Sequence, residues 1–219
     1  DELLDGPCGI QSHSETCVRI DQRGKGRHSS NLPSTLSDLG VEELDLFLIH
    51  WPMPDVGDFV ETWRAMEEIK ASGPCRSIGV SNFQPHHLKR LADETGTVPS
   101  VNQIEVHPYF AQDDVRAVNA EMGIATEAWA PIAQGGVLDD DVLIEIGTAH
   151  GKTAAQATLR WHIQRGDIIF PKSVTPSRVA ENFDIFDVDL TDDEMARITG
   201  LDRDQRNGPN PDEFNMIPK

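Results

Sequence analysis

Short apolar runs alternate along most of the chain with segments in which apolar residues recur every three or four positions. The run 44–49 (LDLFLI) is apolar at five of its six positions, which is typical of a strand buried on both faces. In 59–69 the apolar residues fall at helical spacing, and Gly73-Pro74 ends that pattern. The first regular unit of the chain is therefore a buried strand followed by an amphipathic helix.

The same unit repeats toward the C-terminus. The predicted strands are 44–49, 77–80, 101–106, 124–129 and 168–170. The predicted helices are 59–69, 85–96, 113–121, 140–149, 153–164, 177–183 and one opened by the capping box at 191–194. Because strands and helices alternate five times, the pattern predicts an α/β protein with parallel strands joined by crossover helices.

Two architectures fit this alternation, a doubly wound sheet and a (β/α)8 barrel. No G-x-G-x-x-G turn follows any predicted strand, so the phosphate-binding turn of the doubly wound dinucleotide fold is absent. Polar or aromatic residues instead stand at five successive strand ends, namely His50-Trp51, Ser81-Asn82, Gln103, Trp129 and Lys172-Ser173. In a barrel these ends converge on the mouth where active sites are built. The sequence therefore favours a (β/α)8 TIM-type barrel.

Residues 1–31 differ from the rest of the chain. The stretch 11–30 is polar and has no sustained period of 2 or 3.6, so we predict an irregular segment over 1–31 and the folded part, with a C-terminal tail, over 32–219. Four potential zinc ligands occur here, Cys8, His13, Cys17 and His28. Structural zinc sites use closely spaced cysteine pairs, which this spacing lacks, so we predict no metal.

Composition narrows the classes of function. The chain has 19 basic and 37 acidic residues, a formal net charge of −18. This charge argues against binding to nucleic acid or to an anionic membrane surface, both of which need basic patches. No stretch reaches the roughly 20 apolar residues of a transmembrane helix, and three cysteines do not form a disulfide framework. We therefore expect a cytoplasmic protein, either an ordinary acidic enzyme or, as the less favoured alternative, a salt-adapted one.

Four motifs, in this order, resemble the aldo-keto reductase family: LFLIHWP (46–52), SIGVSNF (77–83), VNQIEVHPY (101–109) and PKSVTPSRVAENF (171–183). The stretch 149–174 is most similar to the bacterial branch that includes 2,5-diketo-D-gluconate reductases. The resemblance implies a barrel enzyme that uses NADPH to reduce aldehydes and ketones, such as sugar-derived keto acids, to alcohols. Its partner would be a small carbonyl substrate.

The resemblance assigns roles to two residues near the first strand. The family's catalytic tetrad is Asp, Tyr, Lys and His, and its histidine corresponds to His50. A histidine at a barrel mouth can donate a hydrogen bond to a carbonyl oxygen, although a lone histidine after an apolar strand is more often structural. Trp51 corresponds to a wall of the substrate pocket, with a plain core or rim tryptophan as the alternative.

The resemblance also implies an extended cofactor site. Ser81, Asn82 and Gln103 would bind the nicotinamide carboxamide, and Trp129 would stack on the nicotinamide ring. Gln134 and Gly135 belong to a loop that would close over the pyrophosphate. The glycine pair Gly135-Gly136 would allow close backbone approach, although such a pair by itself marks only a turn. The residues implied at the adenosine 2′-phosphate are Lys172, Ser173, Thr175 and Arg178, and those at the adenine are Glu181 and Asn182. Val174, in the same segment, is also implied to bind the cofactor.

The Asp, Tyr and Lys of the family's catalytic tetrad have no counterpart in the 219 residues. Tyr109 belongs to the VNQIEVHPY motif, and the residues around Lys25 do not resemble the family's lysine motif. We therefore expect about five βα units, the fourth to eighth strands of a truncated barrel. Full-length relatives are expected to be monomeric, whereas open sheet edges would let this chain self-associate. The alternative function is a catalytically dead nucleotide-binding remnant or interaction module, and an unrelated barrel enzyme is less favoured.

Overall fold

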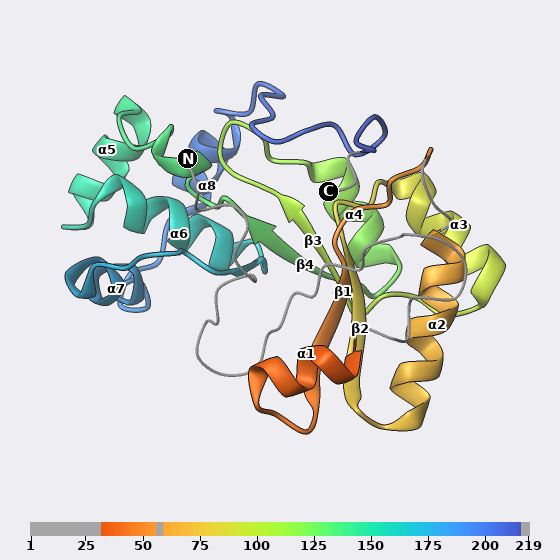
Figure 1. Ribbon diagram of the computed structural model, residues 1–219. Coiled ribbons are helices and arrows are strands. Elements are labelled where there is room, and N and C mark those ends of the chain that lie inside the picture. Colours follow the sequence, from red (N-terminus) through yellow and green to blue (C-terminus); the bar gives the residue numbers. More distant parts are fainter. Residues whose placement is uncertain (1–31, 56–58, 216–219) are drawn as a thin grey trace. The chain divides into compact units, whose positions relative to one another are not determined.

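The computed structural model describes residues 32–55 and 59–215 (Figure 1). Its described residues contain an α/β fold with a parallel sheet, as the alternation predicted. The strands follow chain order in the sheet, and β1 pairs with β2, and β4 with β5, in parallel. The strands are β1 (Leu44–Ile49), β2 (Cys75–Ser81), β3 (Val101–Glu105), β4 (Ala125–Trp129) and β5 (Ile168–Ile169).

Every predicted helix is confirmed to within a few residues. The helices are α1 (Leu32–Leu39), α2 (Phe59–Ser72), α3 (Pro85–Thr95), α4 (Asp113–Glu121), the 3-10 turn η1 (Ala133–Gly135), α5 (Asp141–Ala149), α6 (Ala154–Gln164), α7 (Pro176–Phe183) and α8 (Asp192–Thr199). The prediction missed α1, whose leucines at 32, 36 and 39 do have helical spacing but cover only two turns. Helix α7 starts one residue early because proline suits the first helical position.

Four of the predicted strands have different ends in the structure. Strand β2 is longer than 77–80, since its register pairs Cys75 with Leu44 and extends the ladder backward. Strand β3 ends at 105 rather than 106, β4 begins at 125 rather than 124, and β5 has two residues rather than three. Residues 1–31, with the four potential zinc ligands, lie outside the described residues.

The described chain divides into two compact units. The first unit comprises 32–55, 59–102, 122–124 and 210–215, and the second comprises 103–121 and 125–209. The C-terminal tail therefore joins the first unit, although the sequence separates it from β1 by about 160 residues. Each unit has its own buried core.

In the first unit, β1 and β2 pack against α2 (Figure 1). Trp63 and Met66 are fully buried on one face of α2, and Phe47 of β1 is fully buried as well. Gly79 of β2 lies in contact with the side chain of Leu48, so that an added Cβ would come within 2.7 Å of its Cδ2 atom. The apolar runs of the sequence therefore form a close-packed layer that fixes the carboxyl ends of β1 and β2.

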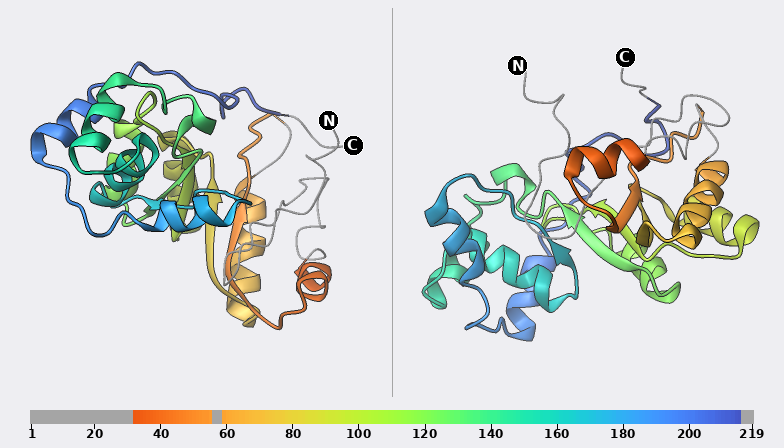
Figure 2. Two further views of the ribbon diagram at one scale, coloured as in Figure 1. Left: turned by 90° about the vertical axis from the view of Figure 1, so that its left-hand side faces the viewer. Right: turned by 60° about the horizontal axis from the view of Figure 1, so that its bottom comes forward.

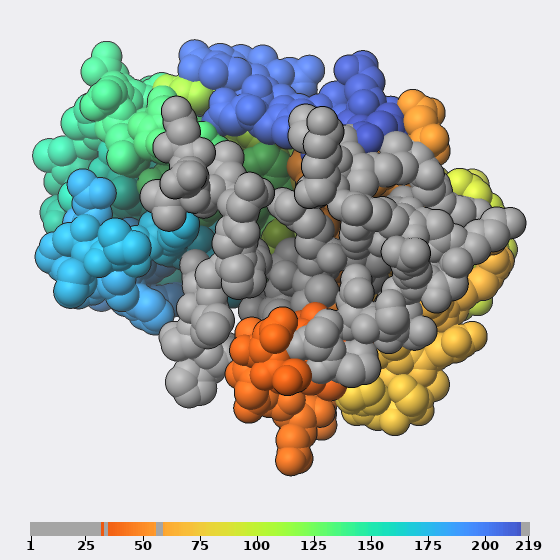
Figure 3. Space-filling view, in the orientation of Figure 1, coloured from red at the N-terminus to blue at the C-terminus, as the bar shows by residue number. Residues whose placement is uncertain are grey.

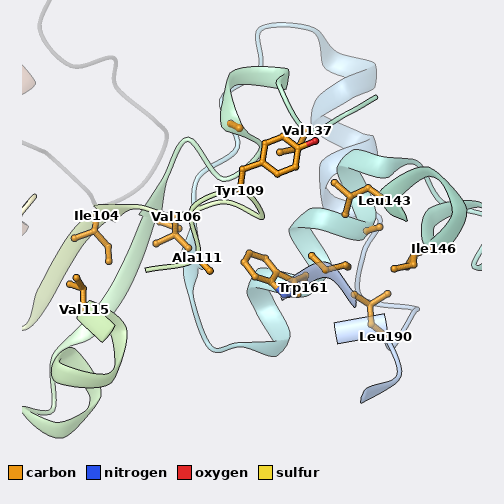
Figure 4. Close-up of a cluster of buried hydrophobic side chains, with 14 residues drawn as sticks. Ile104, Val106, Tyr109, Ala111, Val115, Val137, Leu143, Ile146, Trp161 and Leu190 are labelled. Atoms are coloured by element: carbon orange, nitrogen blue, oxygen red, sulfur yellow. The ribbon is translucent and has the colours of Figure 1, made fainter. Parts of the chain in front are cut away.

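The second unit has its core between helices and the loops that follow β3 and β4 (Figure 4). Trp161 of α6 is fully buried, and Leu143 and Ile146 come from α5, which packs against α6. Helix α6 also packs against α7 and α8, as the two further views show (Figure 2). This helical layer supports the segments that follow β4 and β5. Among the described residues, no helix has the length and apolar character that crossing a membrane requires.

A buried ionic network joins α6 to the loop after β4. The Asp167 carboxylate accepts hydrogen bonds from Arg116 Nε at 2.9 Å and from His162 Nδ1 at 2.9 Å. The other ring nitrogen of His162 contacts the Pro131 carbonyl oxygen at 3.0 Å. The side chains of Asp167 and His162 are both fully buried. The network therefore holds the backbone at Pro131, where the chain leaves β4.

Candidate active site

The carboxyl ends of β1 and β2 bring together three residues singled out in the sequence. Asn82 Nδ2 donates to the His50 carbonyl oxygen at 3.0 Å and to Ser81 Oγ at 3.2 Å. Ser81 and Asn82 are buried, whereas the His50 side chain is half-buried. Asn82 has a φ of 63°, in the left-handed region that asparagine tolerates better than most residues. Its backbone turn and its amide thus fix the chain that carries His50.

Trp51 lies next to His50 and contacts the C-terminal tail. Its ring centroid is 5.9 Å from the His50 ring in an edge-on arrangement and 4.4 Å from the Phe214 ring. Asn215, the next residue, accepts a hydrogen bond from the Asp55 backbone N–H and donates one to the Asp55 carboxylate, both at 2.9 Å. Phe214 was not predicted from the sequence, in which its only signal was an isolated aromatic residue in a polar tail.

A second contact holds the tail through two histidines of α3. Asp212 Oδ1 is 3.3 Å from His86 Nε2 and 3.6 Å from His87 Nε2. The backbone N–H of Gln84 donates to His87 Nδ1 at 3.1 Å, so the proton of the neutral ring is on Nε2 and faces Asp212. Burial lowers the pKa of His87 to about 4, which keeps the ring neutral at physiological pH.

The same three side chains are the described residues best grouped for a metal ion. Their ligand atoms lie within 4.8 Å of one another. A metal ligand must present a free lone pair, however, and His87 Nε2 carries the ring proton when Nδ1 accepts from Gln84. The arrangement therefore brings Asp212 of the tail close to α3, but His87 lacks the free Nε2 lone pair that a metal ion would need.

In the second unit, Gln103 and Trp129 lie on the neighbouring strands β3 and β4. The prediction of Gln103 at a strand end was wrong, because β3 continues through Ile104 to Glu105. Gln103 is half-buried, and its Nε2 donates to the carboxylate of Glu127, a buried residue of β4. Trp129 ends β4 and is half-buried, and its carbonyl oxygen accepts from the backbone N–H of Val106 at 3.3 Å. An added Cβ at Gly208 would lie 2.5 Å from the Trp129 ring, so these two residues are in close contact.

Glu105, at the end of β3, is a fully buried acid that the sequence analysis did not select. Its carboxylate accepts from the backbone N–H groups of Asn207 at 2.7 Å and Gly208 at 3.0 Å. His107 Nε2 lies 3.1 Å from the same carboxylate. Burial raises the pKa of Glu105, but the His107 and backbone hydrogen bonds outweigh it and hold that pKa below its usual value. The signal in the sequence that could have identified Glu105 is an acidic residue within a strand predicted to be buried.

The loop after β4 has a strained backbone. Ala133, Gln134 and Gly135 are consecutive residues with φ of 50°, 55° and 97°. Gln134 is exposed, and two non-glycine residues in the left-handed region are costly and concentrate at functional sites. The two residues selected from the sequence, Gln134 and Gly135, therefore lie on a turn whose backbone is held in an unusual conformation.

The segment from 172 to 178 is exposed around the start of α7 (Figure 3). Lys172 and Arg178 are exposed, and Val174 is 91% exposed. Ser173 Oγ accepts from the Thr175 backbone N–H at 3.2 Å, so the chain turns immediately before the helix. Thr175 precedes the helix as its N-cap residue, and the first helical N–H groups are left for water or a ligand.

The two cations of this segment differ from Lys152 in whether they pair with acidic side chains. Within residues 32–55 and 59–215, neither Lys172 nor Arg178 forms an ion pair. Lys152, in contrast, lies between Asp184 and Asp187 at 2.8 Å from each. A cation pair without carboxylate partners, next to a helix N-terminus, is suited to bind an anion.

The two residues implied at the adenine lie near the end of α7. Glu181 accepts a hydrogen bond from Thr153 Oγ1 at 2.8 Å, and its carbonyl oxygen accepts from Gln156 Nε2 at 3.1 Å. Asn182 follows it on the helix and is half-buried. These bonds join α7 to the N-terminus of α6 and hold Glu181 in place.

Comparison with known proteins decides the family. The aldo/keto reductase family model matches residues 25–203. The chain belongs to the aldo/keto reductase family. The resemblance seen in the four motifs is thereby confirmed, and the α/β fold with a parallel sheet agrees with that family.

Individual aldo/keto reductases are similar over most of the chain. An aldo-keto reductase of Mycolicibacterium smegmatis is 51% identical over 183 residues, covering 84% of the chain and 66% of that protein. Methylglyoxal reductase DkgA of Escherichia coli K12 is 49% identical over 185 residues, covering 84% and 67%. A crystal structure of a Gox0644 mutant in complex with NADPH is 45% identical, with a TM-score of 0.87, and covers 91% of this chain and 74% of that one. The chain spans about two thirds of the length of these curated relatives.

Proposed function

We propose that this chain binds NADPH and takes part in the reduction of aldehydes and ketones to alcohols. The observation that carries the proposal is the exposed pair Lys172 and Arg178 beside the N-terminus of α7. The 45% identical Gox0644 mutant, crystallised with NADPH, supports the same cofactor. We further propose that the five strands are the fourth to eighth strands of a (β/α)8 barrel.

The adenosine 2′-phosphate distinguishes NADPH from NADH, and the proposed phosphate site has the chemistry to recognise it. Two cations supply charge-assisted hydrogen bonds, and the hydroxyl groups of Ser173 and Thr175 lie in the same turn. The helix N-terminus adds backbone N–H donors and a favourable dipole. In a chain with a net charge of −18, most of the surface repels an anion, so these two cations stand out as a place where one could bind.

For the nicotinamide end, we propose polar and aromatic residues of strands β2, β3 and β4 and of the turn that follows β2. A carboxamide needs a donor and an acceptor, and Ser81, Asn82 and Gln103 carry hydroxyl and amide groups of that kind. Trp129 supplies an aromatic face at the end of β4 on which a nicotinamide ring can stack. Gln134 and Gly135 are proposed to lie along the pyrophosphate, where a close backbone approach is needed.

Bound NADPH supplies a hydride for the carbonyl carbon. His50 is proposed to donate a hydrogen bond to the carbonyl oxygen and so orient the substrate, while Trp51 forms a wall beside it. Small carbonyl compounds are the proposed substrate class, because DkgA, 49% identical, is a methylglyoxal reductase. That relationship does not favour the alternative of a catalytically dead remnant.

The cofactor proposal is tested with the double variant Lys172→Ala and Arg178→Ala. Each charge-assisted hydrogen bond to a phosphate is worth about 1.5–3 kcal/mol, so the NADPH dissociation constant should rise at least ~100-fold. NADH, which has no 2′-phosphate, should bind almost as before. Both constants are measured by tryptophan fluorescence with the 219-residue chain. A variant lacking the exposed Lys70 and Lys89 has the same net charge and serves as the control.

An equal loss of NADPH and NADH affinity in the first variant, or an equal effect in the control, would overturn the assignment of the phosphate site. Adding methylglyoxal to the NADPH complex and following NADPH absorbance then measures turnover separately from binding. Binding without NADPH consumption would restore the non-catalytic alternative for this chain.

A further inference from the structure

The segment after α8 contacts the Trp129 ring through a residue without a side chain. Gly208 lies so close that an added Cβ would be 2.5 Å from Trp129 Cη2 and 3.1 Å from Cζ2. The same added atom would be 3.2 Å from Glu105 Oε2. Gly208 is therefore packed between the six-membered edge of the indole and a buried carboxylate.

Space, rather than backbone conformation, makes glycine necessary at this position. The φ of Gly208 lies outside the left-handed range, so an alanine could adopt the same backbone. A distance of 2.5 Å to a ring carbon is far below van der Waals contact, so a methyl group must displace the ring or the turn. The position of Gly208 and the position of the Trp129 ring thus determine each other.

Glu105 determines where Gly208 lies. Its two carboxylate oxygens accept from consecutive backbone N–H groups, those of Asn207 at 2.7 Å and Gly208 at 3.0 Å. The carboxylate is fully buried, and its Oε1 atom also lies 3.1 Å from His107 Nε2. Charge-assisted hydrogen bonds of this kind are strong and directional, so they hold the turn in one place. Glu105 belongs to strand β3 and not to the segment 207–208 that it holds.

We propose that Glu105 is a positioning residue that holds Gly208 against the Trp129 ring and so fixes the plane on which nicotinamide stacks. The inference rests on the proposed function, because it takes Trp129 as the stacking partner. Because Gly208 lies against the edge of the ring, the Trp129 ring cannot rotate toward residues 207 and 208. The acid thereby acts on the cofactor through the backbone of residues 207 and 208, without touching it.

The test begins with Gly208→Ala in a chain labelled with 5-fluorotryptophan. The chain has four tryptophans, and Trp129→Phe identifies the 19F resonance of Trp129. The alanine variant should shift that resonance and leave the other three in place. Stacking of a base on an aromatic ring is worth about 1–3 kcal/mol, so NADPH affinity should fall about tenfold. Affinity for 2′,5′-ADP, which has no nicotinamide, should stay within about twofold.

Two further variants separate positioning from general damage. Gln205→Ala changes an exposed side chain in the same segment and should alter neither the resonance nor the affinity. Trp129→Phe removes the ring atoms that meet the added methyl, so the double variant Trp129→Phe with Gly208→Ala should bind NADPH as Trp129→Phe alone does. Glu105→Gln replaces an acceptor oxygen with a donor and should shift the Trp129 resonance in the absence of cofactor.

The results distinguish the inference from the proposed function. If the parent chain binds neither NADPH nor 2′,5′-ADP, the proposed function fails and the positioning role toward nicotinamide fails with it. If the parent binds both, and Gly208→Ala leaves the resonance and the NADPH affinity unchanged, only the inference is overturned. If Gly208→Ala prevents folding, the other two variants decide. The inference is overturned if the double variant also fails to fold, or if Glu105→Gln leaves the Trp129 resonance where it is.

Discussion

Replacing Asp167 with asparagine should be among the most destabilising single changes in the second unit. The carboxylate is fully buried and accepts from Arg116 Nε and His162 Nδ1, both at 2.9 Å. Asparagine has the same size but no charge, and its amide nitrogen would face a donor. Removing one partner of a buried ion pair costs about 3–5 kcal/mol. For a chain of this length, that loss corresponds to a melting temperature lower by roughly 6–20 °C.

The same change has a defined pH dependence. Burial raises the pKa of Asp167, but the His162 hydrogen bond and the nearby charges outweigh it and hold that pKa below its ordinary value. A depressed carboxyl pKa stabilises the fold above the unfolded pKa of about 4, and the stabilisation is lost as pH falls through the folded pKa. The unfolding curves of the parent and Asp167→Asn should therefore differ at neutral pH and converge in acid.

The measurement is urea unfolding followed by circular dichroism at several pH values. Arg197→Ala is the control, since Arg197 and Glu145 form an exposed ion pair at 2.8 Å, the loss of which should leave the urea midpoint almost unchanged. A loss below about 1 kcal/mol for Asp167→Asn at neutral pH, or the same loss at every pH, would refute the reasoning.

Two further changes test the first unit. Gly79→Ala would place a Cβ 2.7 Å from Leu48 Cδ2 and 2.8 Å from the backbone oxygen of Val101; overpacking of about 1–3 kcal/mol should lower the urea midpoint, and an unchanged midpoint would contradict the packing. Cys75 is buried, and burial raises the pKa of its thiol. Iodoacetamide should therefore modify Cys75 only after denaturant is added, as mass spectrometry of its peptide would show. Rapid modification of the folded chain would argue against that burial.

The strand and helix pattern could be predicted because burial imposes a period on the sequence. Strand β1 and helix α4 have the predicted ends, since each has a regular pattern bounded by a clear stop. The capping box at Thr191 is present, because it depends only on residues three apart. Ser81 and Trp129 could be selected for the same reason, because they end strands that the pattern shows, whereas Gln103 lies in the middle of β3.

The contacts of residues 207–215 could not be predicted. Phe214 on Trp51, Asp212 near His87 and Gly208 on Trp129 join residues that lie far apart in the sequence. These residues have no hydrophobic period, so their sequence does not indicate which other residues they contact. These contacts depend on where the chain returns in space, which local propensity does not specify.

Helix α7 has no buried residue, and this affects how the proposed phosphate site responds to its ligand. A helix of eight residues without a buried face gains little from packing, so its hydrogen bonds open at low free energy compared with those of α6. An anion that binds at its N-terminus binds the closed form and suppresses that opening. The amide protons of 176–183 should therefore exchange quickly with solvent in the free chain and slow down in proportion to ligand occupancy, so that α7 itself reports how far the site is filled.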